Sequence, residues 1–135
     1  MTDRSRSRAR VKAPLTDLEH EVMRVIWDHG PSTVEAVYEV VSKKRDLKET
    51  TVRTLLRRLE QKGYLGHESA GRAYVYKATE PPRNFAARAV RQIIDRFCQG
   101  SVEELVTGMV EAQALSRDEL SRLEEFAREK RKGRR

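Results

Sequence analysis

Apolar residues recur at helical spacing in three segments between residues 15 and 63. Residues three and four positions apart lie on one face of an α-helix, so each stripe predicts an amphipathic helix that buries one side. The three stripes consist of Leu18, Val22, Val25 and Ile26, of Val34, Val37, Tyr38 and Val41, and of Val52, Leu55, Leu56 and Leu59. Gly30-Pro31 ends the first predicted helix, and Gly63 ends the third.

Most of the predicted helices begin at a recognisable cap. A Ser or Thr followed three residues later by Glu can satisfy two unpaired backbone amides at a helix start. This pattern occurs at Thr16/Glu19, Ser32/Glu35, Ser101/Glu104 and Ser116/Glu119. The third helix lacks it, because Lys48 stands where its N-cap is expected. Its first turn is therefore the least defined by the sequence.

The periodicity changes after Gly63. Two short strand-like runs, Tyr64 to Glu68 and Ala73 to Lys77, flank a predicted hairpin turn at Ser69-Ala70-Gly71-Arg72. Three helices followed by a two-stranded hairpin, over residues 15–79, form the winged-helix arrangement. A generic helical domain is the alternative, and the hairpin directly after the third helix favours the winged helix.

Residues 82–132 hold three more amphipathic helices. Their apolar positions are Phe85, Ala89, Val90, Ile93, Ile94 and Phe97, then Val102, Leu105, Val106, Met109 and Val110, and then Leu120, Leu123, Phe126 and Ala127. About 50 residues in three helices rarely bury enough apolar area alone, whereas a second copy of the chain would cover these stripes. The residues expected at this homodimer interface are Phe85, Val90, Ile93, Ile94, Phe97, Leu105, Met109, Val110 and Leu123. Packing onto the winged helix within one chain is the alternative.

The predicted fold class is therefore mainly α with a small β-hairpin. A winged helix-turn-helix domain over residues 15–80 precedes a helical dimerisation domain over 81–132, with a basic disordered arm at 1–14 and a basic tail at 133–135. The low aromatic content, 6% against 36% charged residues, agrees with a helical molecule rather than a β-sandwich or barrel.

The net charge of +7 indicates a polyanionic partner, either nucleic acid or an anionic membrane surface. This charge is concentrated at the two ends of the chain. Residues 1–14 carry five cations and residues 128–135 carry six, whereas residues 15–127 carry 17 cations and 19 anions. The ends are either disordered, solubilising segments or flexible arms that contact phosphates. The charged ends alone therefore do not indicate DNA, and only residues in the middle of the chain can do so.

The third predicted helix presents a polar, basic face opposite its apolar stripe. Arginine can bind guanine bidentately, threonine can contact a thymine methyl group or a phosphate, and such a helix fits the major groove. An ordinary solvated face is the alternative. However, only Glu60 stands near to offset the charges of Arg53, Arg57 and Arg58 on this helix. Arg72 at the hairpin tip is expected to contact the DNA backbone or minor groove. The predicted DNA-binding residues are Thr50, Thr51, Arg53, Thr54, Arg57, Arg58 and Arg72.

Other classes of function lack support in the sequence. The single cysteine, Cys98, excludes an intrachain disulfide and a cysteine zinc site, and His20, His29 and His67 do not have a metal-ligand spacing. No metal or cofactor is expected. No nucleophile–base pair, phosphate loop or paired acid indicates an enzyme. No apolar run approaches the length of a membrane span, and the N-terminus has no apolar signal core. Stable membrane insertion is therefore not expected, and we expect a cytoplasmic location.

Several strings of residues resemble the BlaI/MecI-type penicillinase repressor family. They are Thr51-Val52-Arg53-Thr54-Leu55-Leu56-Arg57-Arg58-Leu59, Lys62-Gly63 and Gly71-Arg72-Ala73-Tyr74, with Leu18, Glu21, Val22, Met23 and Trp27 before them and Gly100-Ser101 after them. The resemblance covers nearly all of residues 15–130. It implies a bacterial, dimeric, autoregulatory repressor that binds a pseudo-palindromic double-stranded DNA operator and blocks a promoter. An effector-sensing winged-helix regulator with a small-molecule ligand is the alternative, although no cluster of buried polar residues argues for one.

The chain departs from this family in two places. Copper-responsive relatives carry a cysteine-rich C-terminal metal site, which a chain with Cys98 alone cannot form. In the penicillinase repressors, a membrane-bound sensor peptidase cuts an Asn-Phe bond in the second C-terminal helix, and the matching position here is Gly108-Met109. Glycine within a helix weakens it, so this place is a candidate cleavage site. Close helix packing at Gly108 is the other interpretation.

Overall fold

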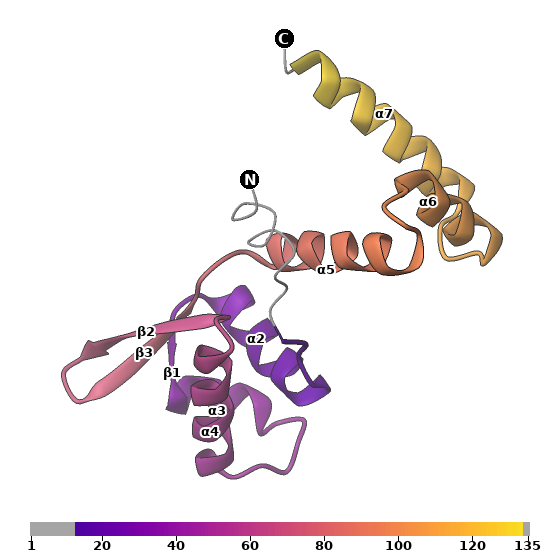
Figure 1. Ribbon diagram of the computed structural model, residues 1–135. Coiled ribbons are helices and arrows are strands. Elements are labelled where there is room, and N and C mark those ends of the chain that lie inside the picture. Colours follow the sequence, from indigo (N-terminus) through magenta and orange to yellow (C-terminus); the bar gives the residue numbers. More distant parts are fainter. Residues whose placement is uncertain (1–12, 134–135) are drawn as a thin grey trace. The chain divides into compact units, whose positions relative to one another are not determined.

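The computed structural model describes residues 13–133, and within this range the predicted order of three helices, a hairpin and three further helices is confirmed (Figure 1). The elements are α2 (Asp17–His29), β1 (Ser32–Thr33), α3 (Val34–Val41), α4 (Glu49–Gln61), β2 (Leu65–Ala70), β3 (Ala73–Ala78), α5 (Pro82–Phe97), α6 (Val102–Glu111) and α7 (Arg117–Gly133). The chain divides into two compact units, with the boundary between Ala89 and Val90. The basic arm predicted at residues 1–14 lies almost wholly outside the described residues, as do Arg134 and Arg135 of the predicted tail.

The first unit has one hydrophobic core, to which all three N-terminal apolar stripes contribute. Leu18 and Tyr38 of those stripes are only partly buried, while the other members are buried. Met23 adds a fully buried side chain to α2, and Tyr64, Leu65 and Tyr76 of the hairpin region complete the core. The core therefore holds α4 against α2, α3 and the base of the hairpin, so the polar face of α4 is left outside.

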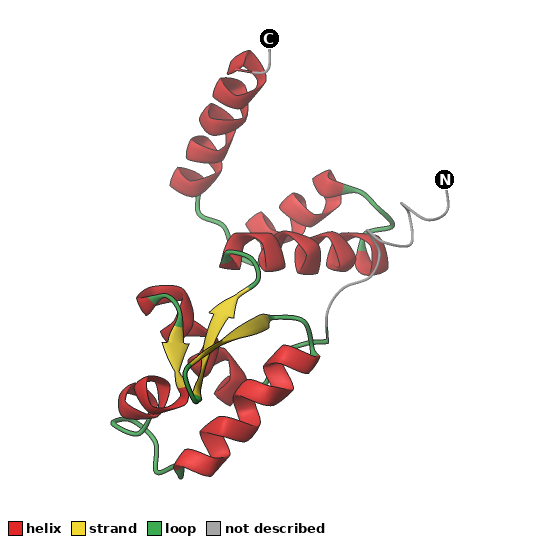
Figure 2. Cartoon of the chain, turned by 90° about the vertical axis from the view of Figure 1, so that its left-hand side faces the viewer, coloured by secondary structure: helices red, strands yellow, loops and turns green. Residues whose placement is uncertain are grey.

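The strands form one antiparallel sheet in the order β1-β3-β2 (Figure 2). Strand β1, which the sequence did not predict, pairs Ser32 with Tyr76 and Thr33 with Val75. Because Ser32 lies in this strand, its hydroxyl donates to the carbonyl of Gly30 at 2.8 Å and does not cap a helix. The predicted Ser32/Glu35 cap is thus wrong: the Thr33 Oγ1 caps α3 by accepting from the Ala36 amide at 3.1 Å.

The other predicted helix starts follow the expected pattern to different degrees. The reciprocal cap is confirmed at Thr16/Glu19 and at Ser116/Glu119, with N–O distances from 2.9 to 3.1 Å. At α6 the Ser101 hydroxyl accepts from the Glu104 amide at 3.0 Å. Helix α4 begins after Lys48 without a side-chain cap, as expected.

The start of α5 belongs to the first unit, beyond the boundary predicted at residue 80. The Phe85 ring centroid lies 4.6 Å from that of Tyr64 and 6.0 Å from that of Trp27. The Trp27 indole donates to the Glu80 carbonyl at 3.1 Å, and Arg88 binds the Glu80 carboxylate at 2.7 and 3.0 Å. Phe85, which its apolar stripe assigned to the dimer interface, packs on the winged-helix unit in this structure.

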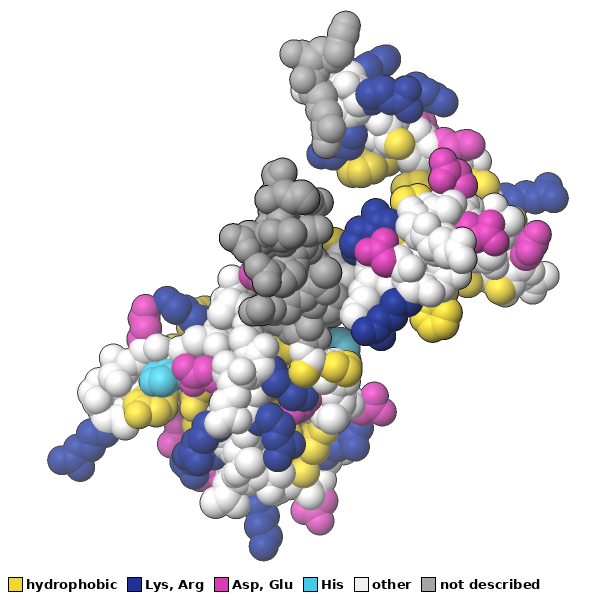
Figure 3. Space-filling view, in the orientation of Figure 1, with side chains coloured by type: hydrophobic (Ala, Val, Ile, Leu, Met, Phe, Trp, Pro, Cys, Tyr) yellow, Lys and Arg dark blue, Asp and Glu magenta, His cyan; other side chains and the backbone are white. Residues whose placement is uncertain are grey.

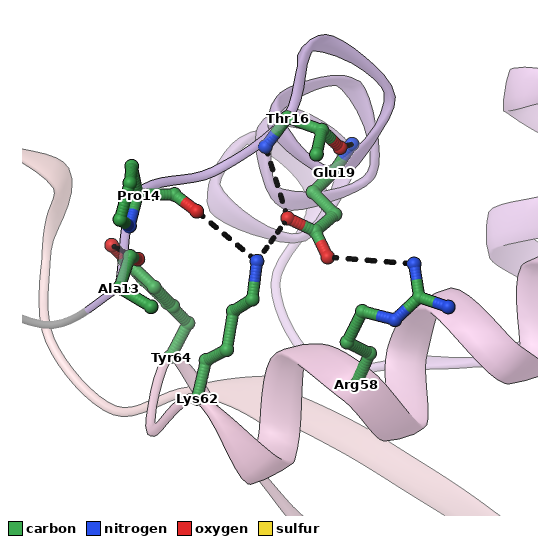
Figure 4. A network of polar contacts seen from close by, with 7 residues as sticks. All are labelled: Ala13, Pro14, Thr16, Glu19, Arg58, Lys62 and Tyr64. Atoms are coloured by element: carbon green, nitrogen blue, oxygen red, sulfur yellow. Dashed lines mark hydrogen bonds and ion pairs between the residues drawn. The ribbon is translucent and has the colours of Figure 1, made fainter.

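A buried carboxylate connects the beginning of α2 to the end of α4 (Figure 4). Glu19 has no exposed surface, and its Oε1 accepts from the Thr16 amide at 3.0 Å and from Lys62 Nζ at 2.7 Å. Its Oε2 lies 4.0 Å from Nη1 of Arg58 and accepts no hydrogen bond from the described residues. One side chain thus serves as a helix cap and as the ion-pair partner of a second helix.

The same contact reaches the chain that precedes α2. Lys62 Nζ also donates to the carbonyl of Pro14 at 3.1 Å, and the Tyr64 hydroxyl donates to the carbonyl of Ala13 at 2.9 Å. These bonds give partners to backbone carbonyls that no regular element would satisfy. The entry into α2, the end of α4 and the start of the hairpin are therefore held together as one polar network.

The network sets the protonation of Glu19. Burial raises the pKa of its carboxyl, but the hydrogen bonds from Lys62 and Thr16 lower it. The charges of Lys62 and Arg58 lower it further, so the net pKa lies below the ordinary value of 4.5. A carboxyl of this kind stabilises the fold fully above its unfolded pKa, and the contribution is lost as the pH falls toward the folded pKa.

We expect Glu19→Gln to lower the free energy of unfolding at pH 7 by about 2 kcal/mol, because it leaves a partly buried ammonium group without its counter-charge. The difference from the parent protein should shrink as the pH falls below 4.5, where the parent carboxylate takes up a proton. Urea unfolding at a series of pH values measures both effects. Glu21→Gln is the matched control, since Glu21 pairs with Arg45 at the surface, and it should cost less. Equal losses for the two variants would contradict the role given to burial.

Candidate nucleic-acid interface

The exposed face of α4 carries the predicted polar residues. Thr50, Thr54 and Arg57 are exposed, whereas Thr51 and Arg53 are partly exposed at the edge of the buried stripe. The Thr54 hydroxyl donates to the Thr50 carbonyl one turn earlier at 3.1 Å and keeps its lone pairs outward. The structure therefore brings these five residues to one accessible surface.

Arg53 and Arg57 form no ion pair with any described residue, although acidic side chains lie near them. Glu60, which the sequence placed as their nearest counter-charge, is instead bound to His67, with the His67 Nδ1 at 2.8 and 2.9 Å from its two carboxylate oxygens. A positive charge that no neighbour neutralises is available to a phosphate or to the edge of a base. These two arginines are the strongest candidates for DNA contact.

Arg58 has a different environment from the other two arginines. Its side chain is 52% exposed but lies with Nη1 4.0 Å from the buried Glu19 Oε2. It therefore neutralises part of the charge of Glu19, on the flank of α4 that turns toward α2. Of the three α4 arginines predicted to bind DNA, Arg58 is the one with an internal electrostatic function.

The charges of two α4 arginines act on Tyr76 in the wing, the hairpin formed by β2 and β3. Burial raises the pKa of the Tyr76 phenol, and so does the charge of Glu60, while the charges of Arg57 and Arg53 lower it. The basic face of α4 and the base of the wing thus share one electrostatic environment. The sequence contained no sign of this, because the residues come from different elements.

The tip of the wing presents Arg72. The hairpin register pairs Ala70 with Ala73, so Gly71 and Arg72 form a two-residue turn. Gly71 has φ +65°, a value that L-residues rarely adopt, and glycine at the first central position is typical of a type II′ turn. Arg72 then occupies the second position and is exposed. In the space-filling view, several Lys and Arg side chains lie over the part of the first unit that contains α4, and one projects from the end of the hairpin (Figure 3).

Within residues 13–133, no group of three His, Cys, Asp or Glu side chains is placed to hold a metal ion. Nor is any described helix long and apolar enough to cross a membrane.

The comparison with family models matches one family. The family described as "Penicillinase repressor" matches residues 15–129 of this chain. The penicillinase repressor of Bacillus licheniformis is 30% identical over 115 residues, which are 85% of this chain and 90% of that protein. The methicillin resistance regulatory protein MecI of Mammaliicoccus sciuri is 26% identical over 116 residues, which are 86% of this chain and 94% of that protein.

Among solved structures, the solution structure of the DNA-binding domain of the repressor BlaI is similar to this chain. It is 36% identical, with a TM-score of 0.49, and the match covers 54% of this chain and 90% of that one.

Proposed function

Because this chain belongs to the penicillinase repressor family, we propose that it represses transcription by binding a pseudo-palindromic operator as a homodimer. It is a DNA-binding repressor and not an enzyme, in keeping with its relatives. The observation that carries the proposal is the pair of unneutralised arginines, Arg53 and Arg57, on the exposed face of α4 beside the wing. Because a repressor acts on chromosomal DNA, the proposed location is the cytoplasm.

In this proposal α4 is the recognition helix. A helix of its diameter enters the major groove, where Arg53 and Arg57 reach base edges or phosphates. Thr50, Thr51 and Thr54 lie toward the N-terminal end of α4, where threonine can bond a phosphate or touch a thymine methyl group. Arg72 lies at the wing tip and contacts the backbone or the minor groove beside the site.

The second unit supports the homodimer, because its apolar side chains lack cover within their own unit. Among its described residues only Ile94 is a buried hydrophobic side chain. The large hydrophobic side chains that remain exposed there are Val90, Ile93, Phe97, Val102, Val110, Leu123 and Phe126. Leu105 and Met109, also predicted at the interface, are partly buried. A monomer that exposes Phe97 at 80% would be unusual, and a second copy offers a complementary apolar surface.

Release of the operator is proposed to follow cleavage of α6 by a membrane-bound sensor peptidase. Gly108 is exposed within α6, and a Cβ atom built there would meet nothing within 4 Å. Close packing inside the chain therefore does not explain the glycine. Since glycine costs a helix about 1 kcal/mol against alanine, α6 should open locally and expose the Gly108-Met109 bond. Cutting there would separate α7 from the rest of the interface.

We expect Arg53→Ala and Arg57→Ala each to weaken operator binding by about 1–3 kcal/mol if the contact is bidentate to a base. Neither change should alter stability, because neither side chain lies in the core. Arg58→Ala is the matched control: it should weaken binding less and should destabilise the fold. Footprinting on the region upstream of the protein's own gene, followed by titration of the protected duplex, measures these effects. Full affinity in both Arg53 and Arg57 variants would remove α4 from the interface.

Ile93→Asp should convert the dimer to a monomer. In the dimer the new carboxylate would be an unpaired charge buried in an apolar interface, whereas in the monomer it would be solvated. Sedimentation equilibrium measures the change in mass. Ser121→Asp places the same charge on an exposed polar position of α7 and should leave the dimer intact. A dimer that survives Ile93→Asp would place the interface elsewhere.

Gly108→Ala should slow cleavage near residue 108 by about fivefold, the factor that corresponds to 1 kcal/mol of helix stability. Limited proteolysis with mass spectrometry locates and times the cuts. Glu111→Gln, in the same helix and with similar helix propensity, is the control. If cuts fall only outside α6 in the parent protein, local opening at Gly108 is not part of the mechanism.

A further inference from the structure

Four side chains join α4 to the wing, and we call them the His67 cluster: Glu60, His67, Tyr74 and Tyr76. The His67 Nδ1 lies 2.8 and 2.9 Å from the two carboxylate oxygens of Glu60. An ionised carboxylate can only accept, so the imidazole Nδ1 carries the hydrogen and donates it. This bond connects the last turns of α4 to strand β2 across the turn at Gly63.

Aromatic contacts hold the imidazole against strand β3. His67 stacks on Tyr74 with ring centroids 4.1 Å apart and an interplanar angle of 21°, and it lies 5.8 Å from the Tyr76 ring. The register explains both contacts, since His67 is opposite Tyr76 and Tyr74 is its diagonal neighbour on the same face of the hairpin. One imidazole, carried by β2, therefore contacts both α4 and β3.

The cluster is the outermost packed layer of the wing. Tyr76 is 3% exposed and belongs to the core, whereas Tyr74 is 49% exposed. Beyond these rings, the turn with Arg72 is exposed. A two-stranded hairpin has little stability of its own, so the direction in which the tip leaves the domain depends on this last layer of contacts.

Glu60 follows Arg57 by three residues and Arg53 by seven, which places it on the same side of α4 as both arginines. The link to His67 therefore begins on the basic face itself. It also directs the Glu60 carboxylate to the wing, and Glu60 forms no ion pair with Arg53 or Arg57.

From this arrangement we propose that His67 is a positioning residue for DNA recognition. It sets the angle between the wing and α4, so that Arg72 reaches the duplex when Arg53 and Arg57 are in the groove. The proposal rests on the DNA-binding function proposed above, and it assigns no DNA contact to His67 itself.

The other ion pair of the hairpin provides a matched control. Lys77 Nζ bonds the Glu68 carboxylate at 2.7 Å. Glu68 and Lys77 lie on the opposite face of the hairpin from His67, because side chains alternate along a strand. This pair links the two strands to each other but not to α4. The double change Glu68→Gln/Lys77→Gln preserves the net charge and should leave wing positioning unchanged.

The test is a set of double-mutant cycles, with binding measured on the duplex protected in the footprint. His67→Ala and Arg72→Ala should each weaken binding by about fivefold, and the double variant should lose no more than one of them alone. The fold-losses in binding from His67→Ala and Arg53→Ala should instead multiply in the double variant, because α4 remains in the groove. Tyr74→Ala, at a half-exposed position that tolerates truncation, should behave as His67→Ala does. The Glu68→Gln/Lys77→Gln variant should bind as the parent does.

The possible outcomes separate this inference from the function on which it rests. If the losses from His67→Ala and Arg72→Ala multiply, or if His67→Ala binds normally while Arg72→Ala does not, the positioning role is wrong and the repressor function stands. The same holds if Arg72→Ala is silent while Arg53→Ala weakens binding. If neither Arg53→Ala nor Arg72→Ala affects binding, the proposed DNA interface itself is wrong.

Discussion

The arrangement of the winged helix depends on a carboxylate that has no access to solvent. Glu19 caps α2, accepts a hydrogen bond from Lys62 at the end of α4, and lies within ion-pair distance of Arg58. Leaving a buried charge without partners would cost several kcal/mol of folding free energy. Moving the start of α2 away from the end of α4 would therefore destabilise the fold. This single side chain therefore helps to decide which way α4, the proposed recognition helix, faces.

The partners of nearby acidic residues also affect the charge of the exposed face of α4. Over residues 15–127 the chain has slightly more acids than bases, so its overall charge there does not create a binding surface. Two acids close to α4 are bound to other partners: Glu19 to Lys62, and Glu60 to His67. Arg53 and Arg57 form no ion pair with any described residue, and their side chains are at least partly exposed. Basic side chains thus reach the surface on α4 in a segment that is not positive on average.

The two units obtain their stability in different ways. The first unit encloses a core of fully buried side chains such as Val22, Leu56 and Leu59. The second leaves most of its large apolar side chains exposed, so its folding and its association with a second copy are expected to be coupled. In the proposed homodimer such coupling would suit a repressor, since any event that disturbs the second unit would also remove the link between the two DNA-binding halves.

The sequence by itself determined most of the elements whose signal is local, and the Ser32/Glu35 cap is the exception. Helical and strand periodicities, the Thr16 and Ser116 caps, the turn at Gly71 and the exposed face of α4 all follow from residues a few positions apart. Tertiary structure alone decided the burial of Glu19 against a lysine 43 residues away, since the sequence pattern of a buried cap and an exposed one is the same. It also decided the two-residue strand β1, the packing of Phe85 on Tyr64, and the Glu60–His67 contact. These features are pairings between separate elements, and no periodicity within one segment encodes its partner in another.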